Sequence, residues 1–233
     1  MLDTLRIPAE GLDELCLKTY HTTGTTFAGL VEMGYTIDPD HWHAHVHGRL
    51  QYGKHLKPDP ELRAVLTSLP QFKAGRVFVF TNADDKHADA CLAALNIRDL
   101  FPRGHVITFE TLQAQAAQRG LAKVLCKPQP EAFRLVLDLV GAVPERTLFL
   151  DDSPRNLKGA AETGIAAVLV GAAEPCPGAI AAVLDVRHLH AAVPWLWYSQ
   201  APAGPMDGVE PVAVLEAEEV EAHASREAIQ VEA

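Results

Sequence analysis

From residue 60 onward, the chain alternates short continuous apolar runs with longer segments whose apolar residues recur at helical spacing. The apolar runs predict strands over 77–80, 106–108, 124–126, 147–150 and 167–170. The periodic segments predict helices over 84–95, 110–118, 130–140, 154–163 and 177–184. Strands that are apolar on both faces and alternate with amphipathic helices indicate a parallel sheet covered by helices on both sides. We therefore predict a three-layer α/β protein.

The regions on either side of this alternating segment have different patterns. Residues 1–57 are rich in Thr, His and Tyr, and we expect helices and loops there. The break at Lys57-Pro58-Asp59-Pro60 precedes helical spacing over 60–69, with Asp59 as the expected N-cap. Beyond Trp197 the chain becomes rich in Pro, Gly and Ala and then acidic, so we expect mostly disorder with a weak helix near 214–228. The expected units are thus 1–57, 58–198 and 199–233.

Charge and composition exclude several classes of partner. The net charge is −10, and residues 200–233 contain eight acidic residues and one basic residue, so most of this charge lies in the tail. An acidic balance disfavours nucleic-acid polymers and acidic membrane surfaces. Four widely separated cysteines without a metal-type spacing indicate reduced thiols. No apolar run is long enough for a membrane span and no signal peptide is evident, so we expect a cytoplasmic or nuclear protein, or an organellar one if the N-terminus is incomplete.

Polar residues follow three of the predicted strands. Thr81 and Asn82 come after the strand 77–80, Lys127 follows 124–126, and Asp151-Asp152 end the strand 147–150. Because ligands bind at the carboxyl ends of strands in such sheets, we expect these residues to form one site. Adjacent carboxylates favour a hard cation such as Mg²⁺, while a hydroxyl and an ammonium suit a phosphate. Taken singly, each is also explained structurally: a helix cap, a turn or a solvated lysine.

The order of these residues resembles the haloacid dehalogenase superfamily of phosphatases. Phe80-Thr81-Asn82 is similar to its second motif, Lys127 to its third and Asp151-Asp152 to its fourth. More narrowly, several stretches are similar to the pyrimidine-5′-nucleotidase-like branch, of the suppressor of disruption of TFIIS type. These stretches are 20–30, 46–50, 56–60, and 126–128 followed by 131–133. The resemblance covers roughly residues 12–198.

The resemblance implies a Mg²⁺-dependent hydrolase that acts on a small phosphorylated substrate, typically a nucleoside monophosphate, through an aspartyl-phosphate. It implies that Thr81, Asn82 and Lys127 bind the transferring phosphoryl group, with Thr81 and Lys127 as the catalytic residues. Asp151 and Asp152 would then hold Mg²⁺. A partial helical cap over 1–57 would close over the leaving group, with Thr25 and Thr26 on the substrate. The implied fold is a Rossmann-like sheet of strand order 5-4-1-2-3.

The family's Asp-x-Asp nucleophile motif, on the first strand, has no counterpart before the cap-like region. Asp38-Pro39-Asp40 is the sole Asp-x-Asp of the chain, and it lacks a preceding apolar strand. The strand expected to be missing is central, between those ending at Thr81 and Asp151. Its loss would remove on the order of 10 kcal/mol of the stabilisation that comes from burying its side chains. We therefore expect an unstable chain, or a gap filled by another segment. A truncated sequence is one explanation; an inactive relative that binds phosphate or a partner is the alternative. Either way, we predict no turnover by the chain as given.

Four alternate histidines, His41, His43, His45 and His47, form a tract that could bind a metal. On a helix, His43 and His47 share a face because they are four residues apart. Zinc is one interpretation, and ordinary residues of the helical cap are the other.

Overall fold

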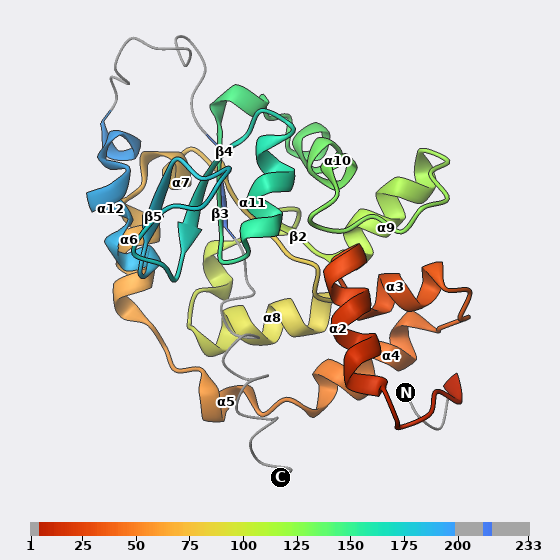
Figure 1. The fold of residues 1–233 in the computed structure, drawn as a ribbon. Coiled ribbons are helices and arrows are strands. Elements are labelled where there is room, and N and C mark those ends of the chain that lie inside the picture. Colours follow the sequence, from red (N-terminus) through yellow and green to blue (C-terminus); the bar gives the residue numbers. More distant parts are fainter. Residues whose placement is uncertain (1–4, 199–211, 216–233) are drawn as a thin grey trace.

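The computed structural model describes residues 5–198 and 212–215, and its centre is a parallel six-stranded sheet (Figure 1). The strand order is β2-β1-β6-β3-β4-β5, and every neighbouring pair is parallel. This confirms the predicted α/β class. The strands are β1 (Val77–Phe80), β2 (Val106–Ile107), β3 (Thr147–Asp151), β4 (Ala166–Val170), β5 (Ala181–Val183) and β6 (Val212–Leu215).

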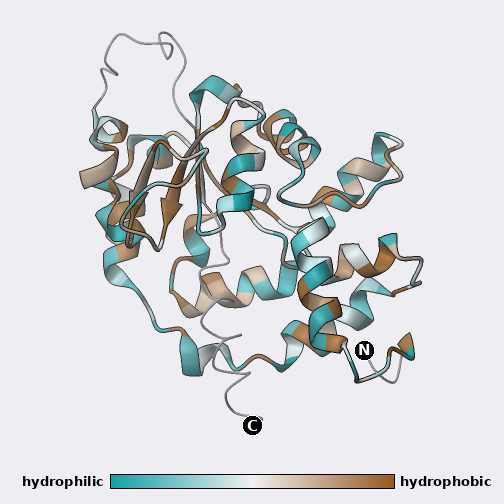
Figure 2. Cartoon of the chain, viewed as in Figure 1, coloured by the Kyte–Doolittle hydropathy of each residue, from teal (hydrophilic) through white to brown (hydrophobic). Residues whose placement is uncertain are grey.

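Side chains alternate between the two faces of the sheet and so build two separate cores. Phe78, Phe80 and Phe149 face one core, which the helices α9, α10 and α11 cover. Leu148 and Leu150 face the other, which α6, α8 and α12 cover. The brown strands of Figure 2 are apolar on both faces for this reason. The helices that cover the sheet are α6 (Pro60–Ser68), α8 (Asp85–Ala94), α9 (Phe109–Gln118), α10 (Pro130–Val140), α11 (Pro154–Ala161) and α12 (Leu189–Ala192).

The N-terminal part of the chain is helical, as expected, and lies beside the sheet in Figure 1. Helices α2 and α3 pack closely because Gly29 has no side chain where it meets Thr19: a Cβ at Gly29 would lie 2.4 Å from the Thr19 Cβ. Among the described residues, no helix has both the length and the apolar character that a membrane crossing requires. The remaining α-helices of the described residues are α2 (Leu12–Thr23), α3 (Thr26–Glu32), α4 (Pro39–Val46), α5 (Tyr52–His55) and α7 (Pro70–Lys73). The 3₁₀ turns are η1 (His47–Arg49), η2 (Arg98–Leu100), η3 (Pro144–Arg146), η4 (Val186–His188) and η5 (Pro194–Trp197).

Two local predictions are wrong. Residues 124–126 form no strand, because the Gln113 side chain takes the place of a neighbouring strand: its Oε1 accepts from Leu125 N–H at 3.1 Å and its Nε2 donates to Leu125 O at 2.5 Å. Residues 177–184 form no helix, because 181–183 pair with β4 as strand β5. The periodicity of a short Ala-rich run does not distinguish these outcomes.

The expected gap at the centre of the sheet is filled by a segment of the tail. Strand β6 pairs with β1 on one side, through Val79 opposite Leu215, and with β3 on the other, through Leu150 opposite Leu215. The tail was expected to be disordered with a weak helix near 214–228, so 212–215 correct that expectation. The rest of 199–233 lies outside the described residues. The physical reason is backbone pairing, since β1 and β3 would each leave a row of N–H and C=O groups unpaired without β6.

We predict that a chain ending at residue 198 loses at least about 3 kcal/mol of unfolding free energy, because several ladder groups of β1 and β3 lose partners worth about 1–3 kcal/mol each when buried. Urea unfolding followed by circular dichroism measures this. A chain ending at residue 218 retains β6 and serves as the control. Equal denaturation midpoints for both truncated chains would contradict the structural role of β6.

Candidate active site at the carboxyl edge of the sheet

The polar residues predicted at the strand ends do come together. Thr81 directly follows β1 and is buried; its N–H donates to Ile107 O, and its hydroxyl accepts from Ala83 N–H at 3.0 Å. This second bond is a local turn between a side chain and the following backbone. It fixes the loop that leaves the strand, so that Asn82 is directed toward the segment that carries Lys127.

Asn82 holds the Lys127 backbone with both ends of its amide. Its Oδ1 accepts from Lys127 N–H at 2.9 Å, and its Nδ2 donates to Lys127 O at 3.0 Å. A side-chain amide can satisfy one donor and one acceptor in this way, as a neighbouring strand would. The loops after two distant segments are therefore fixed to each other, and the lysine is fixed with them.

Lys127 is fully buried and its ammonium lies among oxygen atoms and aromatic rings. Its Nζ is 3.0 Å from Phe80 O and 3.3 Å from Asp151 Oδ2. It also lies 5.2 Å and 5.6 Å from the ring centres of Phe80 and Phe149. A buried ammonium is strongly unfavourable unless it is paired and hydrogen-bonded, and ring faces add a favourable cation–π term. The site therefore holds a fixed positive charge where the strands end.

Asp151 accepts hydrogen bonds on both of its oxygens. Oδ1 accepts from Ser153 N–H at 2.7 Å, and the Asn156 amide donates to Oδ1 and Oδ2 at 3.0 Å each. Together with Lys127, these donors occupy most of the hydrogen-bond acceptor sites of one carboxylate. Asp152 is only half-buried, so it is the more accessible of the two carboxylates. The adjacent acids therefore differ: one is held rigidly, and the other is open.

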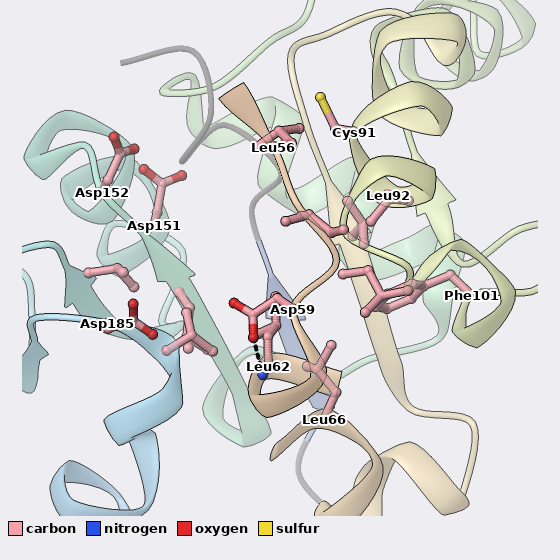
Figure 3. A pocket seen from close by; sticks show the side chains of 16 residues that line it. Leu56, Asp59, Leu62, Leu66, Cys91, Leu92, Phe101, Asp151, Asp152 and Asp185 are labelled. Atoms are coloured by element: carbon pink, nitrogen blue, oxygen red, sulfur yellow. Dashed lines mark hydrogen bonds between the residues drawn. The ribbon is translucent and has the colours of Figure 1, made fainter. Parts of the chain in front are cut away.

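A cavity of about 210 Å³ lies beside this edge of the sheet. Asp151 and Asp152 stand at one side of it, as Figure 3 shows, with Asp185 close by and Leu92 and Phe101 among the apolar residues across it. Asp59, another wall residue, caps α6 by accepting from Leu62 N–H at 2.8 Å. The cavity is thus mostly apolar with acidic groups at its rim, a common composition of small-molecule sites.

Thr25 and Thr26 lie in the N-terminal helices, and the hydrogen bonds recorded for their hydroxyls stay within that segment. Thr25 caps α3 by accepting from Ala28 N–H at 3.0 Å, and Thr26 donates to Cys16 O at 3.4 Å. The residue before them touches the site instead. A Cβ built at Gly24, where φ is 96°, would lie 1.9 Å from Lys127 O. The turn between α2 and α3 therefore packs directly on the Lys127 loop.

Two further residues belong to the site. Asn156 ends the sequence stretch that contains Asp151 and Asp152, and its amide holds both oxygens of Asp151. Asp185 reaches the cavity rim from the end of the sheet beyond β5. Only the three-dimensional fold brings it near β3, so no local spacing could have identified it.

The fold and the buried lysine–carboxylate pair define an α/β protein with a charged site at the carboxyl edge of its sheet. Residues 8–164 match the model of the haloacid dehalogenase-like hydrolase family. This is more than half of the chain, and the chain belongs to that family. The family generally uses Mg²⁺ and includes phosphatases that act on small phosphorylated substrates.

Individual relatives are more distant. Phosphate metabolism protein 8 of Saccharomyces cerevisiae is 27% identical over 161 residues, which are 67% of this chain and 48% of the yeast protein. Mouse acyl-CoA dehydrogenase family member 10 is 39% identical over 70 residues, which are 30% of this chain and 6% of the mouse protein. The chain thus spans about half or less of these relatives. A haloacid dehalogenase-like protein of unknown function from Agrobacterium tumefaciens shares the fold, with a TM-score of 0.50 and 16% identity over 76% of this chain and 81% of that one.

We predict that Gly24→Ala detaches the α2–α3 turn from the Lys127 loop, because its Cβ would overlap Lys127 O. Gly34→Ala is a matched control: Gly34 also has a positive φ, of 92°, but no atom within 4 Å of its Cβ position. In the control, backbone strain alone should lower the unfolding free energy by about 1–2 kcal/mol. In Gly24→Ala, overpacking should lower it by about 1–3 kcal/mol more. Urea unfolding measures both. Equal losses would show that the contact does not constrain the turn.

We also predict that Lys127→Met lowers the unfolding free energy by about 3–5 kcal/mol, because Asp151 is left as a buried charge without its cation. Adding Asp151→Asn should recover at least about 1 kcal/mol of this, since the uncompensated charge is removed. A double-mutant cycle from denaturant unfolding measures the coupling. Strictly additive losses would contradict a stabilising Lys127–Asp151 pair.

Proposed function

We propose that this chain provides the phosphate and metal site of a Mg²⁺-dependent phosphomonoester hydrolase whose substrate is a nucleoside monophosphate. The observation that carries the proposal is the buried Lys127 ammonium 3.3 Å from Asp151, beside the more open Asp152. A fixed cation next to a carboxylate pair suits a phosphoryl group and a divalent metal together. The coarser assignment, a haloacid dehalogenase-like hydrolase, rests on the family match.

In this proposal the Thr81 hydroxyl and the Asn82 backbone N–H donate to the phosphoryl oxygens, because the Asn82 side chain is already bonded to the Lys127 backbone. Lys127 neutralises the charge of those oxygens. Because Lys127 is already fixed by Asn82 and Phe80 O, it can act without reorganising when charge develops on the phosphate. Asp152, with its half-buried carboxylate, and Asp151 would hold Mg²⁺. Two carboxylates fit the oxygen donors that this ion prefers, and the ion would orient the phosphate and stabilise its charge.

The nucleotide specificity rests on resemblance and on the position of the N-terminal helices. We propose residues 1–57 as the partial cap over the core of residues 58–198. The packing of Gly24 on the Lys127 loop supports Thr25 and Thr26 as residues near the leaving group. The name of the yeast relative refers to phosphate metabolism and to no substrate. The apolar wall of the cavity is compatible with a nucleobase.

The nucleophile distinguishes the two candidate functions. The carboxyl end of β3 supplies two acids and the loop that follows residue 126 supplies the lysine, but the aspartate that the resemblance requires belongs on the central strand, where β6 lies. The chain as given would then bind phosphate without hydrolysing it. This favours, as the second candidate, a non-catalytic module that binds a phosphorylated ligand or a partner.

The test adds an N-terminal strand ending in Asp-x-Asp to the chain. Because β6 fills the central position, the extended chain is made both with and without residues 199–233. We expect Mg²⁺-dependent release of phosphate from UMP or CMP in at least one form, loss of that release in Asp152→Asn, and none from the chain as given. A parallel measurement of the intact mass of the native protein establishes whether such a strand exists.

The outcomes separate the candidates. Folded extended chains without phosphate release would overturn the hydrolase proposal, and phosphate binding that requires Lys127 would then support the binding module. Turnover by the chain as given would contradict our interpretation of the missing nucleophile. Release from other phosphomonoesters but not from nucleotides would overturn the specificity alone.

A further inference from the structure

A second cluster of ligand-type side chains lies outside the site described above. His43 of α4 and His47 of η1 are four residues apart, so they present their rings on one side of the helix. Both rings meet Asp84, which follows β1 and caps α8. His43 Nδ1 is 3.2 Å from Asp84 Oδ2, and His47 Nδ1 contacts the same oxygen. One ligand atom of each residue lies within 4.8 Å of the other two.

The cluster is shielded from solvent and its first histidine is held in place. The side chains of His43, His47 and Asp84 are 10%, 14% and 4% exposed. The His43 ring packs on Phe27 and Phe109, with ring centres 6.0 Å and 5.8 Å apart. Within the described part of the chain, neither nitrogen of this ring forms a hydrogen bond of acceptable geometry. A buried imidazole directed at a carboxylate without such a bond is unusual for a purely structural histidine.

Asp84 presents an ionised carboxylate to the two rings. Burial alone would raise its pKa, but the adjacent imidazoles of His43 and His47 and the His87 backbone N–H outweigh this and hold the pKa well below its usual range. Its Oδ1 accepts from His87 N–H at 2.9 Å as the cap of α8. This leaves Oδ2 for the histidines. One carboxylate oxygen thus faces two imidazole nitrogens.

We propose that His43, His47 and Asp84 bind a divalent first-row transition ion, with zinc as the best-fitting probe. Two histidines and a carboxylate are a common ligand set for such ions. Ligand atoms about 2 Å from one tetrahedral zinc lie about 3.3 Å apart, close to the 3.2 Å between His43 Nδ1 and Asp84 Oδ2. The ion would replace the direct contact of His47 with Asp84, and a fourth position would remain for water.

The position of the cluster gives it a consequence for the whole molecule. Asp84 is three residues from Thr81, whereas His43 and His47 belong to the N-terminal helices. A bound ion would therefore cross-link these helices to the loop that leaves β1. Tyr52 supports the same junction, because its hydroxyl lies 2.8 Å from His87 Nδ1 and donates to His47 O at 3.2 Å. These contacts hold the backbone of His47 beside α8.

The test titrates the metal-free full chain with zinc alone, above the ordinary imidazole pKa of about 6.5, by calorimetry and chelator competition. We expect one ion per chain. Loss of a residue that only hydrogen-bonds a metal ligand typically weakens metal binding about 10–100-fold. The double variant His43→Gln with His47→Gln removes two ligands, so it should weaken zinc binding by more than this. His41→Gln with His45→Gln is the matched control. These residues are also four apart and their rings are 4.1 Å apart, but both are exposed, so this variant should bind as the parent does.

A second measurement keeps the proposal testable if a variant is less stable. Asp84→Asn keeps the size of the side chain and its ability to cap α8. Zinc should raise the melting temperature of the parent chain and of the His41/His45 variant, each compared with its own metal-free form. It should not raise that of Asp84→Asn. Absence of the rise in the parent, or its loss in the His41/His45 variant, would overturn the site and favour a plain hydrogen-bonded His–Asp–His cluster.

Discussion

The buried ammonium of Lys127 constrains the structure around it. Removing a charge from water costs several kcal/mol, and this cost is recovered only if the partners are near and correctly directed. Phe80 O and Asp151 supply that pairing from the ends of β1 and β3, and Asn82 fixes the backbone that carries the lysine. The distance between the ends of β1 and β3 must therefore stay fixed. The element that lies between these two strands sets that distance.

Strand β6 occupies that intervening position. Its parallel pairing with both β1 and β3 keeps these strands in one continuous sheet. The ion pair and the central strand consequently depend on each other: the first links the strand ends, and the second sets the separation across which the link is made. An added N-terminal strand would have to compete for the same backbone partners, which is why the hydrolase test includes chains without the tail.

The local sequence pattern was sufficient to predict the buried strands. The strands at 77–80 and 147–150 are buried on both faces, and for this reason their sequences are continuous apolar runs. The residues that follow them, Thr81 and Asp151, lie at one edge because parallel strands end together. Lys127 reaches the same edge although its segment is not a strand. There the Gln113 amide makes the backbone hydrogen bonds that a neighbouring strand would make. This arrangement depends on a residue of helix α9, 12 positions earlier in the chain.

Long-range pairing was not predictable in the same way. The segment 212–215 lies in an acidic, Pro- and Ala-rich tail, and only the unpaired edges of β1 and β3 make it a strand. Likewise, helical spacing placed His43 and His47 on one face, but nothing in the sequence indicated that Asp84 faces them. Among their contacts with the core, the N-terminal helices place Gly24 on the Lys127 loop and His43 with His47 on Asp84. One of these contacts lies on the lysine loop and the other just beyond Thr81, so the N-terminal helices pack against both segments that flank the candidate site.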